Sequence, residues 1–117
     1  MPNGLTVTTT RPDDRTVVIA TRGEIDLLTV SDIKRVIADE LADEAVKNLV
    51  VDLTDTVFID STGLGLLLGT QRRLRESGGQ LAVVNDNDAV AMTFAITGLD
   101  QVLDIYSTRE QALAPRS

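Results

Sequence analysis

Hydrophobic residues are spaced differently along different parts of the chain. Residues 6–10 and 16–21 are rich in β-branched side chains, and residues 47–53 and 80–84 form nearly continuous apolar runs. β-branched runs predict strands, and continuous apolar runs predict strands that are covered on both faces. A Pro-Asp-Asp sequence separates the first two strands, so we expect them to form a hairpin. A last short strand is expected at residues 102–106.

Helical spacing of apolar residues follows the hairpin and each later strand. Helices are expected from Thr29, from Ser61 and over residues 89–97, with a final helical turn after Ser107. Thr29, Ser61 and Ser107 are the predicted N-caps, and two of them have a carboxylate three positions later as a capping-box partner: Asp32 and Glu110. The second helix is expected to stop at a Ser-Gly-Gly sequence and to turn four leucines inward: Leu64, Leu67, Leu68 and Leu74.

The resulting order of elements is β-β-α-β-α-β-α-β-α. Alternation of strands and helices predicts an α/β fold, with a mostly parallel mixed sheet, an antiparallel N-terminal edge pair and about four flanking helices. The 117 residues are enough to bury one hydrophobic core. We therefore expect a single domain over residues 1–117, with an ordered core at about residues 5–113.

Composition and charge exclude several classes of function. The chain has 11 Lys and Arg against 18 Asp and Glu, and its net charge of −7 disfavours binding to nucleic acid or to anionic membranes. Aromatic residues make up only 3%, which argues against a stacking surface for bases or sugars. The sequence contains no cysteine and no histidine, so disulfides, thiol chemistry, a Ser-His-Asp triad and His-ligated metals are excluded.

The hydropathy of the chain also bears on its location. No apolar run has the length of a membrane span, and the N-terminal residues lack the charged-then-apolar layout of a secretory signal. The lack of cysteine is compatible with a reducing compartment. A cytoplasmic location is therefore expected.

Acidic residues gather where the predicted strands end. Glu24 and Asp26 follow the second strand, and acids also occur within residues 52–60 and 85–88. Carboxylates at one sheet edge can bind Mg²⁺, whereas the simpler interpretation is that each acid caps a turn or a helix. A phospho-aspartate receiver is excluded because the only lysines, Lys34 and Lys47, are far from the last strand. We favour the capping interpretation and predict no metal site.

Three glycines lie within seven positions of the second predicted helix: Gly63, Gly65 and Gly69. Each glycine inside a helix costs about 0.5–1 kcal/mol relative to alanine, so three together need a reason. Nucleotide-binding loops do not supply it, because the Walker sequence is absent and the spacing does not match the dinucleotide pattern. Either the helix packs closely on the sheet, or Gly65 and Gly69 form a smooth exposed face that a partner's backbone can approach.

Ser61 admits two interpretations. Its hydroxyl suits an N-cap, because it can accept hydrogen bonds from the first free N–H groups of the helix. The same position would hold a phosphate group against open backbone donors and the positive end of the helix dipole. As an isolated serine before a helix, Ser61 is more often a structural cap than a covalent switch.

Four segments carry a resemblance to a known family. They read Gly-Glu-Ile-Asp at residues 23–26, Val-Val-Asp-Leu at 50–53, Phe-Ile-Asp-Ser-Thr-Gly-Leu-Gly at 58–65 and Ile-Thr-Gly-Leu at 96–99. In order and spacing, over nearly the whole chain, they resemble STAS domains of the anti-sigma factor antagonist type. The Asp-Ser-Thr-Gly-Leu-Gly block is the most specific of these elements.

The resemblance implies a regulator of transcription that works by partner switching, often in a stress response. Such an antagonist, an anti-anti-sigma factor, binds an anti-sigma factor and so frees a sigma factor. The anti-sigma factor is also a serine kinase, and the antagonist dissociates from it once phosphorylated. A metal-dependent serine phosphatase then removes the phosphate and restores binding. The chain is then a phosphoprotein, a substrate of other enzymes with no catalytic residues, no cofactor and no bound metal of its own.

The resemblance also assigns roles to residues. It implies that Ser61 is the phosphorylation site, with Thr62 as a secondary candidate. It implies a partner-binding surface made of Asp26, Asp60, Ser61, Thr62, Gly63, Leu64 and Gly65. The alternative function is a constitutive STAS interaction module in a signalling scaffold or a lipid-transport complex, although such relatives often lose the serine that this chain keeps.

The chemistry of a phosphoserine agrees with a switch. A phosphoserine carries a charge of about −1.5 to −2 at neutral pH, which beside Asp60 would add repulsion and a desolvation cost in a closed interface. The helix N-terminus should tolerate the same charge within the chain. Phosphorylation is therefore expected to remove the partner without unfolding the domain.

Overall fold

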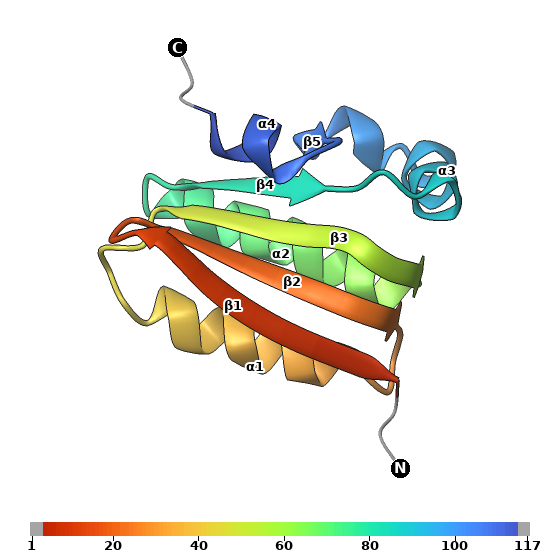
Figure 1. The fold of residues 1–117 in the computed structure, drawn as a ribbon, viewed down its shortest axis with the longest axis horizontal. Coiled ribbons are helices and arrows are strands. Elements are labelled where there is room, and N and C mark those ends of the chain that lie inside the picture. Colours follow the sequence, from red (N-terminus) through yellow and green to blue (C-terminus); the bar gives the residue numbers. More distant parts are fainter. Residues whose placement is uncertain (1–3, 115–117) are drawn as a thin grey trace.

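The computed structural model describes residues 4–114, in which five strands form one mixed sheet in the order β1-β2-β3-β4-β5 (Figure 1). The antiparallel pair is β1 (Leu5–Asp13) and β2 (Thr16–Ile25). The remaining strands are parallel to β2: β3 (Asn48–Ile59), β4 (Gln80–Val84) and β5 (Ile105–Tyr106). The predicted α/β sheet with an antiparallel N-terminal edge pair is confirmed. Residues 1–3 and 115–117 of the predicted domain lie outside the described residues.

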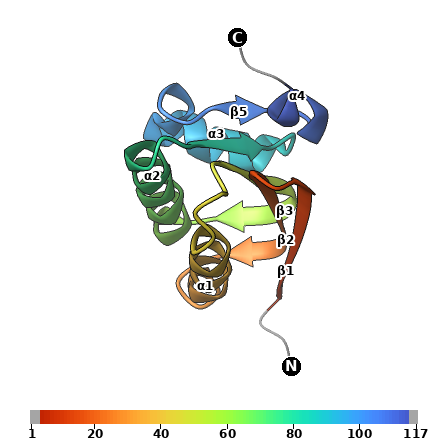
Figure 2. The ribbon, with the colours of Figure 1, turned by 90° about the vertical axis from the view of Figure 1, so that its left-hand side faces the viewer.

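Four α-helices in this part of the chain flank the sheet: α1 (Val30–Leu41), α2 (Ser61–Glu76), α3 (Asp88–Thr97) and α4 (Arg109–Leu113). α1 and α2 lie side by side on one face, and α4 lies on the other (Figure 2). α3 packs beside β3 at the end of the sheet (Figure 1). The predicted order of elements is confirmed, although β5 is shorter than expected: a 3₁₀ turn at Leu99–Gln101 is followed by irregular backbone over residues 102–104, and the strand begins only at Ile105.

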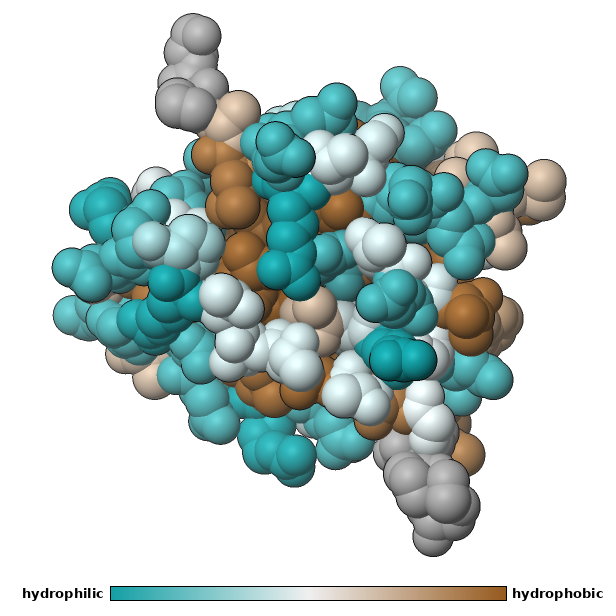
Figure 3. Space-filling view, viewed as in Figure 1, coloured by the Kyte–Doolittle hydropathy of each residue, from teal (hydrophilic) through white to brown (hydrophobic). Residues whose placement is uncertain are grey.

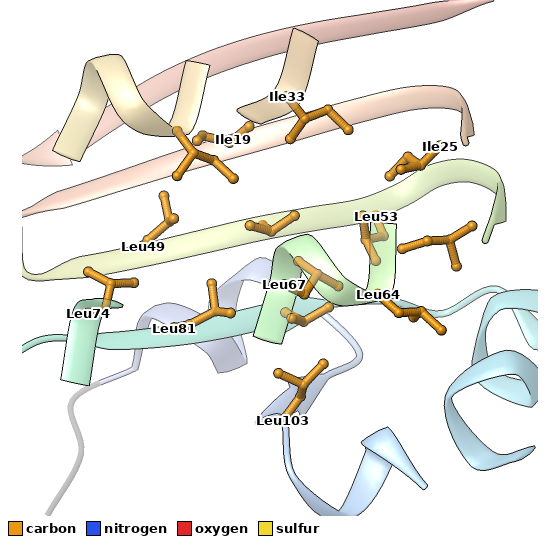
Figure 4. Packing of buried hydrophobic residues seen from close by; sticks show 14 of the residues in the cluster. Ile19, Ile25, Ile33, Leu49, Leu53, Leu64, Leu67, Leu74, Leu81 and Leu103 are labelled. Carbon is orange, nitrogen blue, oxygen red and sulfur yellow. The ribbon is translucent and has the colours of Figure 1, made fainter. Parts of the chain in front are cut away.

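The core lies between the sheet and the pair α1 and α2. β2 and β3 supply its centre, where Val17 pairs with Leu49 and Ile19 with Val51. Helix residues pack onto these strands, and Figure 4 shows several of them: Ile33, Leu64, Leu67 and Leu74. The predicted inner face of α2 is confirmed by this packing, in which Leu68 is only partly buried.

A smaller cluster covers the opposite face of the sheet. Its buried members are Val18, Val50, Ala82, Val84 and Ala112, of which the last comes from α4. Residues 49–53 of β3 are all buried, as the continuous apolar run predicts. The rest of this face is mostly hydrophilic or intermediate in character (Figure 3).

The predicted N-caps of α1 and α4 differ in the structure. Thr29 precedes α1 as expected, but its hydroxyl donates to the carbonyl of Glu24 at 2.8 Å and accepts from the N–H of Asp26 at 3.0 Å. It therefore closes the β2–α1 loop and makes no side-chain cap, so the predicted capping box was wrong. The cap of α4 is Thr108 rather than Ser107, because the Thr108 hydroxyl accepts from the N–H of Gln111.

Candidate functional site

The N-cap of α2 is Asp60, one residue before the predicted Ser61. Asp60 has an extended backbone, and its carboxylate accepts from the N–H of Thr62 at 2.9 Å and of Gly63 at 3.3 Å. The prediction was wrong because β3 continues through the segment that resembled a polar turn and pairs with β2 as far as Ile59. The change from strand to helix therefore falls at Asp60, which is as good a cap as serine.

Ser61 is consequently the first residue of α2, and its side chain is exposed. Its hydroxyl makes no hydrogen bond to any other of residues 4–114. The capping side chains of Asp60 and Asn87, by contrast, each accept from two backbone N–H groups. The hydroxyl is thus open to another molecule. It stands at the N-terminus of a 16-residue helix, where the dipole favours negative charge.

Thr62 is held differently from its neighbour. Its side chain is half-buried, and its hydroxyl donates a hydrogen bond to the carboxylate of Asp60. A kinase would have to break this bond to reach the Thr62 oxygen. Of the two candidate acceptors, Ser61 is therefore the more accessible.

The ionisation of Asp60 follows from its partners. Desolvation raises the pKa of this carboxyl, but hydrogen bonds from the Thr62 hydroxyl and from the N–H groups of Gly63, Thr62 and Leu27 outweigh it. The net pKa is lower than the ordinary value of 3.8. Asp60 is therefore a carboxylate at neutral pH, and any charge added at Ser61 meets an existing negative charge.

The β2–α1 loop adjoins the start of α2. The Asp26 carboxylate accepts from the N–H groups of Leu28 at 3.0 Å and Thr29 at 3.1 Å, which fixes the loop. The N–H of Asp60 donates to the carbonyl of Ile25 at 3.0 Å. Asp26 and Asp60, which the resemblance assigned to one surface, are therefore brought to neighbouring positions by the parallel ends of β2 and β3.

Sequence reasoning missed a set of exposed apolar residues at this end of the sheet, which we call the apolar rim: Leu27, Leu28, Val57, Phe58, Met92 and Ile96. Leu28 is 80% exposed and Ile96 78%. Leu27 and Leu28 lie in the β2–α1 loop, Val57 and Phe58 near the end of β3, and Met92 and Ile96 on α3. These three segments occupy the same end of the molecule (Figure 1). The spacing of Met92 and Ile96, away from the buried pair Val90 and Phe94, was the available signal.

The three helical glycines have different surroundings. A Cβ on Gly63 would lie 2.7 Å from atoms of Ile25 and Ile59, so this glycine permits α2 to pack closely on the sheet. A Cβ on Gly65 or Gly69 would meet nothing within 4 Å. Close packing on the sheet is thus confirmed for Gly63, and Gly65 and Gly69 lie on an open face of α2, whose use by a partner stays a prediction.

The resemblance assigned Leu64 to the partner-binding surface, but its side chain is buried. Only 6% of this residue is exposed, and it packs in the core with Leu53 and Leu67 (Figure 4). Its side chain therefore fixes α2 on the sheet. Within residues 61–65, the exposed positions are Ser61 and Gly65, with Thr62 half-buried.

The acidic residues at the strand ends act within the fold. Asp52 pairs with Arg109 of α4. The side-chain amide of Asn85 donates to the carbonyl of Asn87 and accepts from its N–H. No group of carboxylates in residues 4–114 is arranged to hold a metal ion. The capping interpretation is supported at Asp26 and Asp60, whose carboxylates accept from the backbone N–H groups that follow them.

Comparison with known proteins agrees with this geometry. The STAS domain family model matches residues 7–112. The anti-sigma-B factor antagonist of Staphylococcus aureus is 30% identical over 101 residues, which are 86% of this chain and 93% of that protein. An anti-sigma factor antagonist from Mycobacterium paratuberculosis has a similar structure, with a TM-score of 0.86 and 31% identity over 97% of this chain and 94% of its own.

The anti-sigma factor antagonist SpoIIAA is also similar and has been solved in two states. Its unphosphorylated form has a TM-score of 0.78 and 27% identity over 91% of this chain and 92% of its own. The phosphorylated form of Bacillus SpoIIAA has a TM-score of 0.71 and 26% identity over 91% and 96%.

None of the helices within residues 4–114 has the length and apolar character that a membrane span requires. The family model covers most of the chain, and both the relatives and the sheet topology agree with it. The chain therefore belongs to the STAS domain family, within its group of anti-sigma factor antagonists.

Proposed function

We propose that this protein binds an anti-sigma factor that is also a serine kinase, and that phosphorylation of Ser61 releases it. The observation that carries the proposal is the free hydroxyl of Ser61, exposed on the first residue of α2 and bonded to none of residues 4–114. The apolar rim lies at the same end of the sheet and provides surface for a partner to cover.

The relatives support this proposal. The similar protein from Staphylococcus aureus bears the name anti-sigma-B factor antagonist. SpoIIAA exists in a phosphorylated and an unphosphorylated form, and both resemble this chain over 91% of its length. A fold of this kind therefore accommodates a phosphate group.

Electrostatics explain how one phosphate would act as a switch. A phosphoserine at position 61 would carry a charge of about −1.5 to −2 directly beside the Asp60 carboxylate. Inside a closed interface both charges would be desolvated, and a negatively charged partner surface would be repelled. The N-terminus of α2 favours the same charge by about 0.3–1 kcal/mol, so the phosphate should not destabilise the folded domain.

The same proposal defines the other partners. A metal-dependent serine phosphatase would remove the phosphate and restore binding. The contact surface would comprise Asp26, Asp60, Ser61, Thr62 and Gly65, with the backbone of Gly63 beneath them. The protein would work in the cytoplasm as a substrate and ligand, not as an enzyme.

The test is phosphorylation by the candidate anti-sigma factor kinases of the same genome, each purified and incubated with the protein and ATP. We expect one kinase to add the mass of a single phosphoryl group, located at Ser61 by peptide mass spectrometry. Ser61→Ala should gain no mass. Thr62→Val, which removes the neighbouring hydroxyl, should still be phosphorylated.

A second function competes with the first. A constitutive interaction module in a scaffold or a lipid-transport complex would use the apolar rim without any covalent control. If no kinase modifies the native protein, this second function is favoured. Modification at Thr62 rather than Ser61 would contradict the assignment of the acceptor.

A further inference from the structure

A groove runs between α1 and α2, which lie side by side on the helical face of the sheet (Figure 2). Its volume is about 470 Å³, and Val30 and Ile37 line it from α1. On α2 the lining begins at Thr62 and ends at Arg73, eleven residues later. At 1.5 Å per residue this is a length of about 16 Å, or three helical turns.

The floor of the groove is lowered by two glycines that the fold itself does not require. Gly65 and Gly69 both line it, and a Cβ at either position would extend into open space. Gly63, by contrast, is needed for packing against Ile25 and Ile59. The absence of side chains at Gly65 and Gly69 therefore leaves room for a close approach from outside the chain.

The charge of the groove is opposite to that of the whole protein. The chain has a net charge of −7, yet the charged residues that line the groove are Lys34 and Arg73. Neither of them forms a salt bridge with any of residues 4–114, whereas Arg11, Arg35 and Arg109 do. The groove thus offers two unneutralised cations beside an apolar floor, which is complementary to an acidic amphipathic partner.

We propose that this groove binds an amphipathic helix of the anti-sigma factor, whose apolar side lies over Gly65 and Gly69 and whose flanking acids pair with Lys34 and Arg73. A helix laid in an apolar groove is a common form of recognition, and three turns are enough for anchors at successive turns. This inference rests on the proposed function and names the chemistry of the partner segment.

The position of the groove also connects it to the switch. Its α2 side begins at Thr62, immediately after Ser61. A phosphate at Ser61 would therefore stand at the end of the groove and repel the acidic helix directly. Release would then need no change in the fold of the domain.

The first test compares two charge reversals on the same helix turn. Arg73→Glu and Arg75→Glu change the net charge equally and both lie in the last turn of α2, but only Arg73 lines the groove. In calorimetry with the kinase that phosphorylates Ser61, Arg73→Glu should weaken binding by at least about tenfold and Arg75→Glu by less than about twofold. Equal effects of the two reversals would contradict the proposal that the groove binds the partner. Loss of binding in Ser61→Asp would still support the proposed function.

A second variant separates binding from folding. Gly69→Ala places a methyl group on the floor of the groove at a helix position that alanine favours. We expect its melting temperature to rise and its affinity for the kinase to fall. A rise in melting temperature with unchanged affinity would contradict the proposal.

A designed peptide tests the groove without any natural partner. The probe is a helix with leucines on one side flanked by glutamates, added to ¹⁵N-labelled protein. We expect chemical-shift changes at Lys34, Gly65, Gly69 and Arg73, and none with the same peptide carrying lysines for glutamates. If no kinase binds the protein, the proposed function is wrong, and the peptide still tests whether the groove binds an acidic amphipathic helix. Absence of shifts, or equal shifts with both peptides, would contradict binding in the groove.

Discussion

The hydroxyl of Thr62 donates a hydrogen bond to the carboxylate of Asp60, and this bond distinguishes two adjacent hydroxyl residues. Thr62 helps to fix the start of α2, whereas Ser61 hydrogen-bonds through its side chain to none of residues 4–114. The cap of the helix is therefore complete without Ser61. At this site the Ser61 hydroxyl is therefore free, whereas the Thr62 hydroxyl has a structural role.

Substitution of the two residues should separate these roles. Asp60→Ala removes the cap of α2 and should lower the free energy of unfolding by about 1 kcal/mol. Ser61→Ala should change it by less than about 0.5 kcal/mol, because no hydrogen bond within residues 4–114 is lost. Urea unfolding measures both, and Asp60→Asn, which keeps a capping oxygen, is the control. A cost for Ser61→Ala equal to that for Asp60→Ala would contradict the assignment of the cap.

The same substitution at two nearby glycines should have opposite effects. Gly63→Ala would force a methyl group to within 2.7 Å of Ile25 and Ile59, and should destabilise the protein by about 1–3 kcal/mol. Gly65→Ala meets open space and should stabilise the free protein by about 0.5–1 kcal/mol. Thermal unfolding of the two variants measures the signs. If both variants lose stability alike, the account of the helix surface is wrong.

Acid should weaken the attachment of α4 to the sheet. Burial raises the pKa of Asp52, but hydrogen bonds from Arg109 and from Thr54, together with the charge on Arg109, outweigh it and hold the pKa below 3.8. The stabilisation from this carboxylate is therefore complete above the unfolded-state pKa. It decreases as the pH falls from about 5 and is lost below the pKa of the folded state.

A pair of asparagine variants measures this effect. Asp52→Asn should cost about 1 kcal/mol at pH 7, and the difference from the wild type should shrink as the pH falls towards 3. Asp55→Asn, at an exposed position of the same strand, is the matched control and should differ little from the wild type throughout. A difference between Asp52→Asn and the wild type that stays constant from pH 7 to pH 3 would rule out the Asp52–Arg109 linkage.

The apolar rim should contribute to affinity and little to stability. Leu28→Ser changes a side chain that is 80% exposed, so the free protein should unfold as the wild type does. Binding to the anti-sigma factor kinase should weaken by about 1–2 kcal/mol if Leu28 is buried in the complex. Leu113→Ser, at the end of α4, is the control and should bind normally. Equal affinities for the two variants would exclude the rim from the interface.

The order of the elements could be predicted because each strand and helix has its own hydrophobic spacing. The caps could not, because adjacent residues were equally suitable: Asp60 beside Ser61, and Thr108 beside Ser107. The choice depends on where the preceding strand ends, and β3 extends to Ile59 through its pairing with β2. Tertiary pairing, which the local sequence does not contain, decided the position of the cap.

The positions of the candidate site residues could be predicted only in part, and their roles stay predictions. Ser61 and Asp26 follow from the resemblance, and the parallel strands bring their loops to one end of the sheet. Val57 and Phe58 are exposed where the pairing between β2 and β3 is irregular, with a register shift between Gly23 and Glu24. No periodicity in the sequence reveals such a shift, so the β3 part of the apolar rim was visible only in the structure, whereas the spacing of Met92 and Ile96 on α3 was a signal in the sequence.

The most direct test of the central claim is the affinity of one anti-sigma factor kinase for the protein before and after phosphorylation of Ser61, measured by calorimetry on samples with matched circular dichroism spectra. We expect the unmodified protein and Ser61→Ala to bind with similar affinity, and the phosphorylated protein to lose at least about 3 kcal/mol of binding free energy while remaining folded. Equal affinity of the two forms would contradict the account, and so would loss of binding that occurs only because the phosphorylated protein unfolds.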